Sequence, residues 1–351
     1  MKDDILVVDH VTNYYADNKL GIFSKPGRKQ VLNDVSFAIH KDEFFGLVGE
    51  SGCGKSTLAQ AILGLIPFEG SIKIDGMEYA STDRKMISSR IQAAFQDPMS
   101  SLDPRRTIGA TMREPLIAHG IGSKQEQERS VREMLERVGL DASYSDRYPR
   151  ELSGGQRQRV CIGAALMLEP KLIVADEAVS ALDVSVAAQI LNLFRTIDAK
   201  SEFAMLFISH NLGIEYYLCD RIAVMYSGNI VEIGTADDIY KHPAHPYTKL
   251  LLSAIPDMGK KEENGSADEQ ATVGHDAGSG PNDVRTGSVP AGACCYYARC
   301  PKACDRCLRH QELKKVMNGD DRKSNEPNQF AEDSHGEHFV SCCLQASLES
   351  V

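Results

Sequence analysis

The glycine-rich segment from Gly49 to Ser56 constrains this chain more than any other feature. Its sequence is GESGCGKS, which fits the pattern G-x-x-x-x-G-K-S/T. An apolar run that ends at Val48 precedes it, and a helical pattern over Thr57–Leu65 follows it. A glycine-rich turn between a strand and a helix gathers backbone N–H groups around one point, at the positive end of a helix dipole. The segment therefore predicts an α/β fold with a phosphate-binding loop.

Each residue type in this loop has its own use in binding a nucleotide. The glycines let the backbone turn inward, Lys55 carries a charge for the β- and γ-phosphates, and Ser56 offers a hydroxyl to Mg²⁺. The residues that we expect to contact ATP here are Gly49, Glu50, Ser51, Gly52, Cys53, Gly54, Lys55, Ser56 and Thr57. A chance glycine-rich turn is the alternative, but such a turn does not require both the strand and the helix.

An apolar strand that ends in two acids supplies the partner of this loop. The segment Lys171–Glu177 has the sequence KLIVADE. Asp176 is placed to hold Mg²⁺ through water, and Glu177 is placed to polarise the attacking water as a general base. Acids at the end of a buried strand are also common as plain structure, so this prediction depends on the pairing with the Lys55 loop.

Short apolar or β-branched runs alternate with helical patterns over most of the chain. The expected strands are Ile5–Val8, Phe44–Val48, Ser71–Ile74, Leu172–Ala175 and Met205–Ile208. This alternation is typical of a mostly parallel sheet flanked by helices. The chain has 351 residues and 42% of them are hydrophobic, which is enough for a large buried core.

Composition divides the chain into further parts. Residues 1–256 are expected to form the nucleotide-binding domain. Strand signals stop between about residues 97 and 150, where two amphipathic patterns that begin at Met112 and Lys124 predict an inserted helical subdomain. Residues 257–293 are rich in Gly, Ser, Asp, Glu and Asn, which favours a flexible linker. Residues 294–351 form a small cysteine-rich C-terminal tail.

Charge and hydropathy exclude several classes of protein. The formal net charge of -10 argues against a general nucleic-acid binder, because neutralising phosphates requires clustered Lys and Arg. The segment Met1–His10 has acids where a signal peptide carries basic residues. No apolar run approaches the ~18 residues that cross a bilayer. We therefore expect a soluble chain that reaches a membrane only through a partner.

The segment LSGGQ at residues 152–156, followed by RQR, distinguishes among the families of nucleotide-binding proteins. It resembles the signature of the ATP-binding cassette (ABC) ATPases. A serine and two glycines that open a helix present a second cluster of N–H groups. In that family two ATPase domains pair head to tail. The resemblance therefore implies that Ser153, Gly154, Gly155 and Gln156 close over the γ-phosphate that the partner holds.

Other positions match ABC ATPases in the family's order. Gln96 resembles the Q-loop glutamine that senses Mg²⁺ and the attacking water, and Asp183 belongs to a segment similar to the D-loop at the dimer interface. His210 resembles the switch histidine that contacts the γ-phosphate. Tyr15 is the expected aromatic residue for stacking on adenine, with Tyr14 as its alternative. Each of these residues alone is more often structural than functional, but their shared order makes the resemblance secure.

Three stretches are similar to the ATPase subunits of oligopeptide, dipeptide and nickel importers. They span residues 95–107, 179–185 and 242–256, and the last is the most specific because general ABC chemistry does not require it. The resemblance implies a peripheral ATPase on the cytoplasmic side of the cell membrane. Its implied partners are an identical or homologous second ATPase, two membrane-spanning permeases and an external substrate-binding protein, with no nucleic acid. Peptides, nickel and metal chelates stay open as cargo.

Two residues depart from the family pattern. Asn211 follows the switch histidine where Asp is usual, which indicates either a weaker switch or an altered hydrogen bond. Ala178 stands where Pro is commoner. A subunit that binds ATP but barely hydrolyses it is one alternative, and a soluble ABC ATPase acting on DNA or ribosomes is another. Because Lys55, Asp176 and Glu177 are all present, and only one cassette is found, we expect an active transport ATPase.

The tail holds seven of the ten cysteines. Cys294, Cys300, Cys307 and Cys342 follow a pattern similar to the C-terminal motif of the same importers. Four thiolates suit a four-iron, four-sulfur (4Fe–4S) cluster or a tetrahedral Zn²⁺. The resemblance favours the iron–sulfur cluster. Three further thiols nearby leave the ligand set open, and a tail with disulfides or without any metal remains the alternative.

Overall fold

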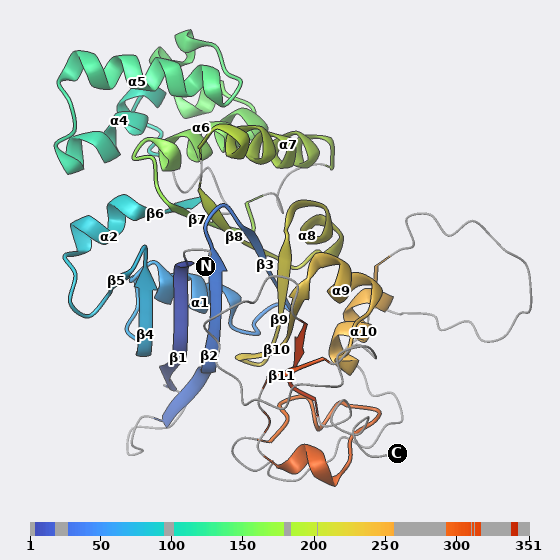
Figure 1. The fold of residues 1–351 in the computed structure, drawn as a ribbon. Coiled ribbons are helices and arrows are strands. Elements are labelled where there is room, and N and C mark those ends of the chain that lie inside the picture. The colour runs from blue at the N-terminus through green and yellow to red at the C-terminus, as the bar shows by residue number, and fades with distance from the viewer. Residues whose placement is uncertain are drawn as a thin grey trace, which may run out of the picture.

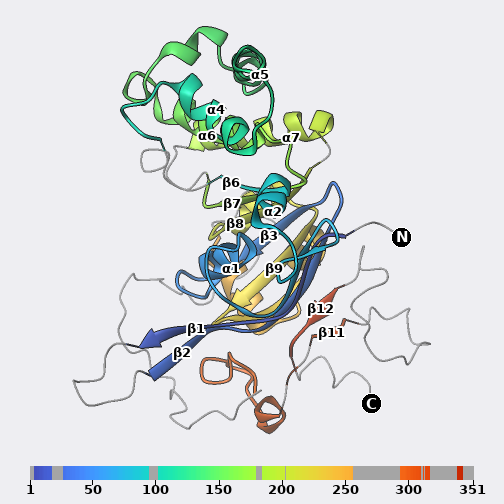
Figure 2. The same cartoon turned by 90° about the vertical axis from the view of Figure 1, so that its left-hand side faces the viewer.

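The computed structural model describes residues 4–17, 27–94, 102–178, 184–201, 203–255, 293–309, 311, 313–316 and 338–342. Within these residues the chain forms two sheets, a group of helices that projects from one end, and a short C-terminal region at the opposite end (Figure 1, Figure 2). No helix in the described ranges is both long and apolar enough to cross a bilayer.

The larger sheet has eight described strands in the order β11-β12-β10-β9-β3-β8-β7-β6. Their bounds are β3 Phe44–Val48, β6 Ile91–Ala94, β7 Leu172–Asp176, β8 Ala204–Ser209, β9 Arg221–Tyr226, β10 Asn229–Thr235, β11 Lys314–Lys315 and β12 Phe339–Val340. The strands from β9 to β6 are parallel, whereas β10, β12 and β11 run antiparallel to their neighbours. The expected mostly parallel sheet is thereby confirmed.

A second, antiparallel sheet has the strand order β2-β1-β4-β5. Its strands are β1 Asp4–Asp17, β2 Gly27–His40, β4 Glu69–Ile74 and β5 Met77–Glu78. The predicted strands Ile5–Val8 and Ser71–Ile74 lie here, so their assignment to the parallel sheet was wrong. Strand propensity could not predict which sheet these strands join. It measures how well a residue suits a half-buried pleated surface and does not identify the neighbouring strand.

The helices are α1 Lys55–Ile62, α2 Arg84–Arg90, α4 Ile108–His119, α5 Lys124–Arg137, α6 Gly154–Leu166, α7 Val184–Ser201, α8 Leu212–Leu218, α9 Ala236–Lys241 and α10 Pro246–Ser253. Short 3-10 turns cover Ala142–Asp146, Pro149–Glu151 and Asp305–Leu308. The two amphipathic helices expected after β6 are confirmed as α4 and α5. Thr107 caps α4, and a capping box between Ser123 and Glu126 begins α5.

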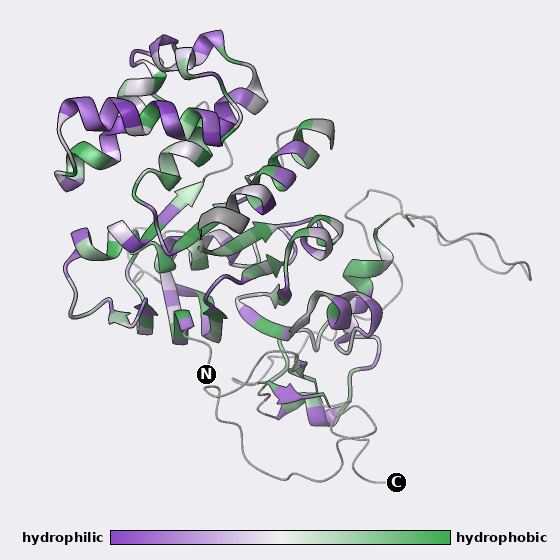
Figure 3. Cartoon of the chain, turned by 45° about the horizontal axis from the view of Figure 1, so that its top comes forward, coloured by the Kyte–Doolittle hydropathy of each residue, from purple (hydrophilic) through white to green (hydrophobic). Residues whose placement is uncertain are grey.

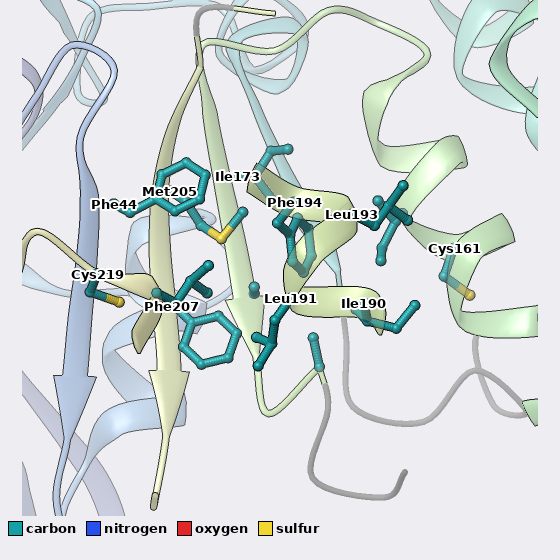
Figure 4. Close-up of a cluster of buried hydrophobic side chains, with 14 of the residues drawn as sticks. Phe44, Cys161, Ile173, Ile190, Leu191, Leu193, Phe194, Met205, Phe207 and Cys219 are labelled. Atoms are coloured by element: carbon teal, nitrogen blue, oxygen red, sulfur yellow. The ribbon is translucent and has the colours of Figure 1, made fainter. Parts of the chain in front are cut away.

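Every residue of β3 is buried, because both faces of the large sheet are covered. Alternate side chains therefore enter two different cores. Phe44 packs with residues of the helices on one face, whereas Phe45 packs with the small sheet and α1 on the other. On the helical face, Phe194 of α7 lies near Met205 and Phe207 of β8 (Figure 4). Figure 3 shows that the strands of the sheets are mostly hydrophobic, whereas the helices of the projecting group carry more hydrophilic residues.

Candidate nucleotide site

The loop between β3 and α1 passes too close to β9 for side chains at some of its glycines. A Cβ atom on Gly49 would lie 2.2 Å from the carbonyl oxygen of Met225. Gly54 precedes α1 with a φ of 116°, a left-handed conformation that favours glycine. The close approach and the backbone conformation explain why the sequence has glycine at both positions.

Lys55 lies on the inner side of this loop. Its ammonium Nζ donates to the carbonyl oxygens of Gly49 at 2.7 Å and of Glu50 at 3.1 Å, and the residue is only 6% exposed. The charge is therefore held over the first two residues of the loop. The sequence predicts that this charge neutralises nucleotide phosphates.

Asp176 ends β7 and lies next to the beginning of α1. Burial raises the pKa of Asp176, while a hydrogen bond with the Ser56 side chain lowers it. Its Oδ1 atom is buried and has no hydrogen-bond partner among the described residues. A buried carboxylate oxygen that lacks a donor, beside a serine hydroxyl, suits a hard cation such as Mg²⁺. These two residues therefore fit the predicted Mg²⁺ ligands.

Glu177 and His210 follow two neighbouring parallel strands, β7 and β8. The backbone N–H of Glu177 donates to the carbonyl oxygen of Ile208 at 2.9 Å, and Glu177 has a φ of 49°. Such a left-handed conformation is uncommon for residues other than glycine and often occurs at functional sites. The Oε1 atom of Glu177 lies 3.5 Å from Nδ1 of His210. The structure thus brings the predicted base and the predicted switch histidine together.

Asn211 has a clear structural role. It is the N-cap of α8, and its Oδ1 atom accepts the backbone N–H groups of Gly213 at 3.0 Å and Ile214 at 3.4 Å. Asn and Asp are about equally good at this position. The replacement of the usual Asp by Asn therefore preserves the cap that begins the helix after the switch histidine.

The signature segment begins α6, as the sequence predicted. Ser153 is the N-cap and forms a capping box with Gln156. A Cβ atom on Gly155 would lie 2.5 Å from Cγ1 of Val186 in α7, whereas one on Gly154 would meet nothing within 4 Å. Gly155 is therefore needed for the packing of α6 against α7. At Gly154 no neighbouring atom would contact an added Cβ, so packing does not require glycine there. In both views α6 lies within the projecting helical group and α1 lies among the sheets (Figure 1, Figure 2).

For the remaining residues that are predicted to contact the nucleotide, the structure gives fewer contacts. Gln96 and Asp183 lie outside the described residues. Tyr14 and Tyr15 are neighbours on β1, and the two residues are 39% and 44% exposed. An exposed ring is available for stacking on a base, but exposure does not distinguish the two tyrosines.

Sequence reasoning missed two residues that contact the phosphate loop from the C-terminal region. The hydroxyl of Tyr247 accepts the backbone N–H of Glu50 at 2.9 Å, and Nη1 of Arg299 lies 3.0 Å from Oε2 of Glu50. Tyr247 falls in the stretch 242–256, which resembles the importer subunits and which general ABC chemistry does not require. No sequence pattern indicates that Arg299 returns to the loop.

A buried carboxylate explains part of the same stretch. Glu232 of β10 is fully buried and accepts the backbone N–H groups of Ala244 at 2.7 Å and His245 at 2.9 Å. It also accepts the hydroxyl of Thr248 and hydrogen-bonds with Nε2 of His338 at 2.6 Å. Glu232 thereby fastens both the segment before α10 and the end of the tail to the large sheet.

The tail cysteines do not form a metal site in the part of the chain that the structure describes, where no three His, Cys, Asp or Glu side chains meet in a suitable group. Cys294, Cys307 and Cys342 are buried and Cys300 is half-buried. The pKa of Cys294 is raised to about 11, first by burial and further by those three neighbouring thiols. The four predicted ligands are thus near one another, although within the described residues they are not drawn together into a group that could hold a metal ion.

A phosphate loop between β3 and a helix, with paired acids at the end of the parallel strand β7, defines the class of P-loop nucleotide hydrolases. Two family models match this chain. The model described as "ABC transporter" matches residues 32–180, and the one described as "Oligopeptide/dipeptide transporter, C-terminal region" matches residues 231–307.

Similar proteins agree with both models. A peptide import ATP-binding protein of Brucella ovis is 45% identical over 295 residues, which cover 83% of this chain and 90% of that protein. The di/tripeptide transport ATP-binding protein DppF of Pseudomonas aeruginosa is 41% identical, covering 87% and 92%. A dimeric ATP-binding cassette bound to ADP and phosphate, in a post-hydrolysis state, has a TM-score of 0.56 at 27% identity, covering 66% and 98%. This chain belongs to the ATP-binding subunits of ABC transporters, in the oligopeptide/dipeptide transporter family, and is an ATPase.

Proposed function

We propose that this chain is an ATP-hydrolysing subunit that powers the uptake of peptides through partner permeases. The observation that carries the proposal is the match of residues 231–307 to the oligopeptide/dipeptide C-terminal region, since general ABC chemistry does not need that region. Relatives named for peptide import and for di/tripeptide transport support peptides over nickel or metal chelates as the cargo.

In the proposed chemistry, the residues of the phosphate loop and those at the ends of β7 and β8 have different roles. Lys55, with the N–H groups of the loop, binds the phosphates of ATP, and Ser56 and Asp176 would hold the Mg²⁺ ion. When bound, the ion would supply charge stabilisation for the transferred phosphoryl group. Glu177 orients the attacking water and accepts its proton. His210, 3.5 Å from Glu177, is placed to contact the γ-phosphate beside that water.

The proposed active unit is a head-to-tail pair of ATPase subunits. Because α6 lies in the helical group and α1 among the sheets, the residues Ser153 to Gln156 serve a loop on another subunit (Figure 1). ATP bound by both subunits favours the closed pair over the open one, and hydrolysis removes that preference. We place the pair on the cytoplasmic side of the membrane beneath two permeases, with an external binding protein delivering the peptide. Gln96 and Asp183 complete the proposed site at the interfaces.

A metal centre in the tail is a separate, smaller proposal. Its support is the donor chemistry of Cys294, Cys300, Cys307 and Cys342 together with the resemblance of their pattern. Metal analysis of anaerobically purified protein tests it. Iron with absorbance near ~400 nm supports the iron–sulfur cluster, zinc supports the alternative, and neither metal at stoichiometric amounts contradicts the proposal.

The experiment that tests the transport function is co-purification from gently solubilised membranes with a tag on this chain. We expect two multi-span permeases and an ATPase partner, and peptide-stimulated ATP hydrolysis once the binding protein is added. Stimulation by nickel and not by peptides would change the cargo. Recovery from the soluble fraction alone, with nucleic acid or ribosomal proteins, would contradict the transport function and leave the ATPase chemistry standing.

A further inference from the structure

Glu50 is the second residue of the phosphate loop. Its carboxylate is negative, and the loop is built for a polyanion, so an unpaired Glu50 would weaken nucleotide binding by repulsion between like charges. The structure pairs this carboxylate with a residue from the far end of the chain. Nη1 of Arg299 lies 3.0 Å from Oε2 and 3.4 Å from Oε1 of Glu50. The separation in sequence is 249 residues.

A second contact fixes the backbone of the same residue. The N–H of Glu50 donates to the hydroxyl of Tyr247, which comes from the beginning of α10 and is fully buried. Glu50 is therefore held through both its side chain and its main chain by residues outside the cassette core. The two contacts act on the loop just before the glycines that turn toward the phosphates.

An aromatic cluster connects Arg299 and Tyr247, the two residues that contact Glu50. The ring of Tyr226, at the end of β9, lies 4.6 Å from that of Tyr247 and 5.1 Å from that of Tyr296. The Arg299 guanidinium lies 5.9 Å from the centre of the Tyr226 ring. Tyr296 is 3% exposed. Offset and edge-on aromatic contacts of this kind have a defined geometry, so the cluster sets where the tail meets the sheet.

The backbone of the tail then presents Arg299 to the loop. The N–H of Arg299 donates to the carbonyl oxygen of Tyr296, and the N–H of Tyr297 donates to that of Cys294, both at 3.0 Å. The N–H of Cys294 donates in turn to the carbonyl oxygen of Cys307 at 2.8 Å. Consecutive turns thus run from the buried cysteines to the arginine, and the place of the guanidinium depends on the fold of the tail.

We propose that Arg299 and Tyr247 are positioning residues for the phosphate loop, through which the folded cysteine-rich tail sets the affinity of the subunit for MgATP. The inference rests on the proposed nucleotide site and adds to it a means of regulation. Arg299 does not take part in the chemistry. It neutralises and restrains Glu50, so that the loop carries no uncompensated negative charge when it receives the phosphates.

The test is a double-mutant cycle in the full chain, with the Kd of MgADP measured by calorimetry and the KM and kcat measured for MgATP. We expect Arg299→Ala to raise both Kd and KM about two- to fivefold, as suits a half-exposed ion pair, with kcat nearly unchanged. Arg299→Lys keeps the charge and should restore part of the affinity. In a Glu50→Gln background, Arg299→Ala should have no further effect.

The control is Arg309→Ala, because Arg309 is an exposed arginine of the same tail. It should leave Kd, KM and kcat unchanged. If Arg299→Ala does not fold, as judged by its melting temperature, Tyr247→Phe and Arg299→Lys carry the test, since Phe keeps the ring and removes only the acceptor of the Glu50 N–H.

Three results would overturn the inference. They are an unchanged Kd in Arg299→Ala, an equal loss of affinity in the Glu50→Gln background, and a loss confined to kcat. The second would mean that Arg299 acts on the nucleotide itself. Failure of the unmodified chain to bind MgADP would instead refute the proposed nucleotide site, and the inference with it.

Discussion

Glu232 offers the sharpest test of how the C-terminal region is fastened. Its carboxylate is fully buried between β10 and the segment before α10. Replacing Glu232 by Ala removes the acceptor for the backbone N–H groups of Ala244 and His245, for the Thr248 hydroxyl and for the His338 ring.

The expected loss of stability is large. A buried donor that loses its partner costs ~1–3 kcal/mol, so the two backbone N–H groups alone account for about 2–6 kcal/mol. We therefore expect Glu232→Ala to lower the free energy of unfolding by about 2–6 kcal/mol. That is a sizeable part of the ~5–15 kcal/mol that stabilises a typical domain.

Urea unfolding of the purified chain, followed by circular dichroism, measures this loss. Glu133→Ala is the matched control, because Glu133 is an exposed carboxylate of α5 that pairs with Arg129 on the same helix. It should leave the midpoint nearly unchanged. A loss below about 1 kcal/mol in Glu232→Ala would refute the reasoning, since it would show that the buried donors find other partners.

Three further predictions concern the site and its support. Glu177→Gln should lower kcat about 10²- to 10⁴-fold while the Kd of MgADP stays the same, and persistent hydrolysis would require another base. Gly155→Ala should lower the melting temperature, because its Cβ would lie 2.5 Å from Cγ1 of Val186 and overpacking costs ~1–3 kcal/mol. Gly154→Ala is the control with open space, and equal melting of the two variants would contradict the packing argument. Burial raises the pKa of Glu215 well above its usual value, so the native state keeps a proton that the unfolded chain releases. Stability should therefore fall as the pH rises above about 4.3, the ordinary pKa of Glu, toward the raised pKa, and Glu215→Gln should flatten this dependence in unfolding experiments across pH. An unchanged slope would mean that Glu215 is ionised when folded.

Local chemistry was enough to predict most of the nucleotide site. The phosphate loop, the acids Asp176 and Glu177, and the helix start at Ser153 are each encoded within a few consecutive residues. Their chemistry depends on backbone N–H groups, a strand end or a helix terminus, all of which form from neighbouring residues. The contact between Glu177 and His210 was also predictable, because parallel strands end at the same edge of a sheet.

Tertiary structure alone decided the partners of residues that lie far apart in sequence. The pairing of Glu50 with Arg299 spans 249 residues, and that of Glu232 with His338 spans 106. The position of β1 and β4 in a separate antiparallel sheet was likewise decided by the tertiary structure. In each case the residue types were visible in the sequence but their distance was not, since an ion pair, a buried hydrogen bond or a strand pairing depends on the path of the whole chain. Sequence thus determined which chemistry this ATPase has at its phosphate loop, and only the folded chain determined that its tail reaches that loop.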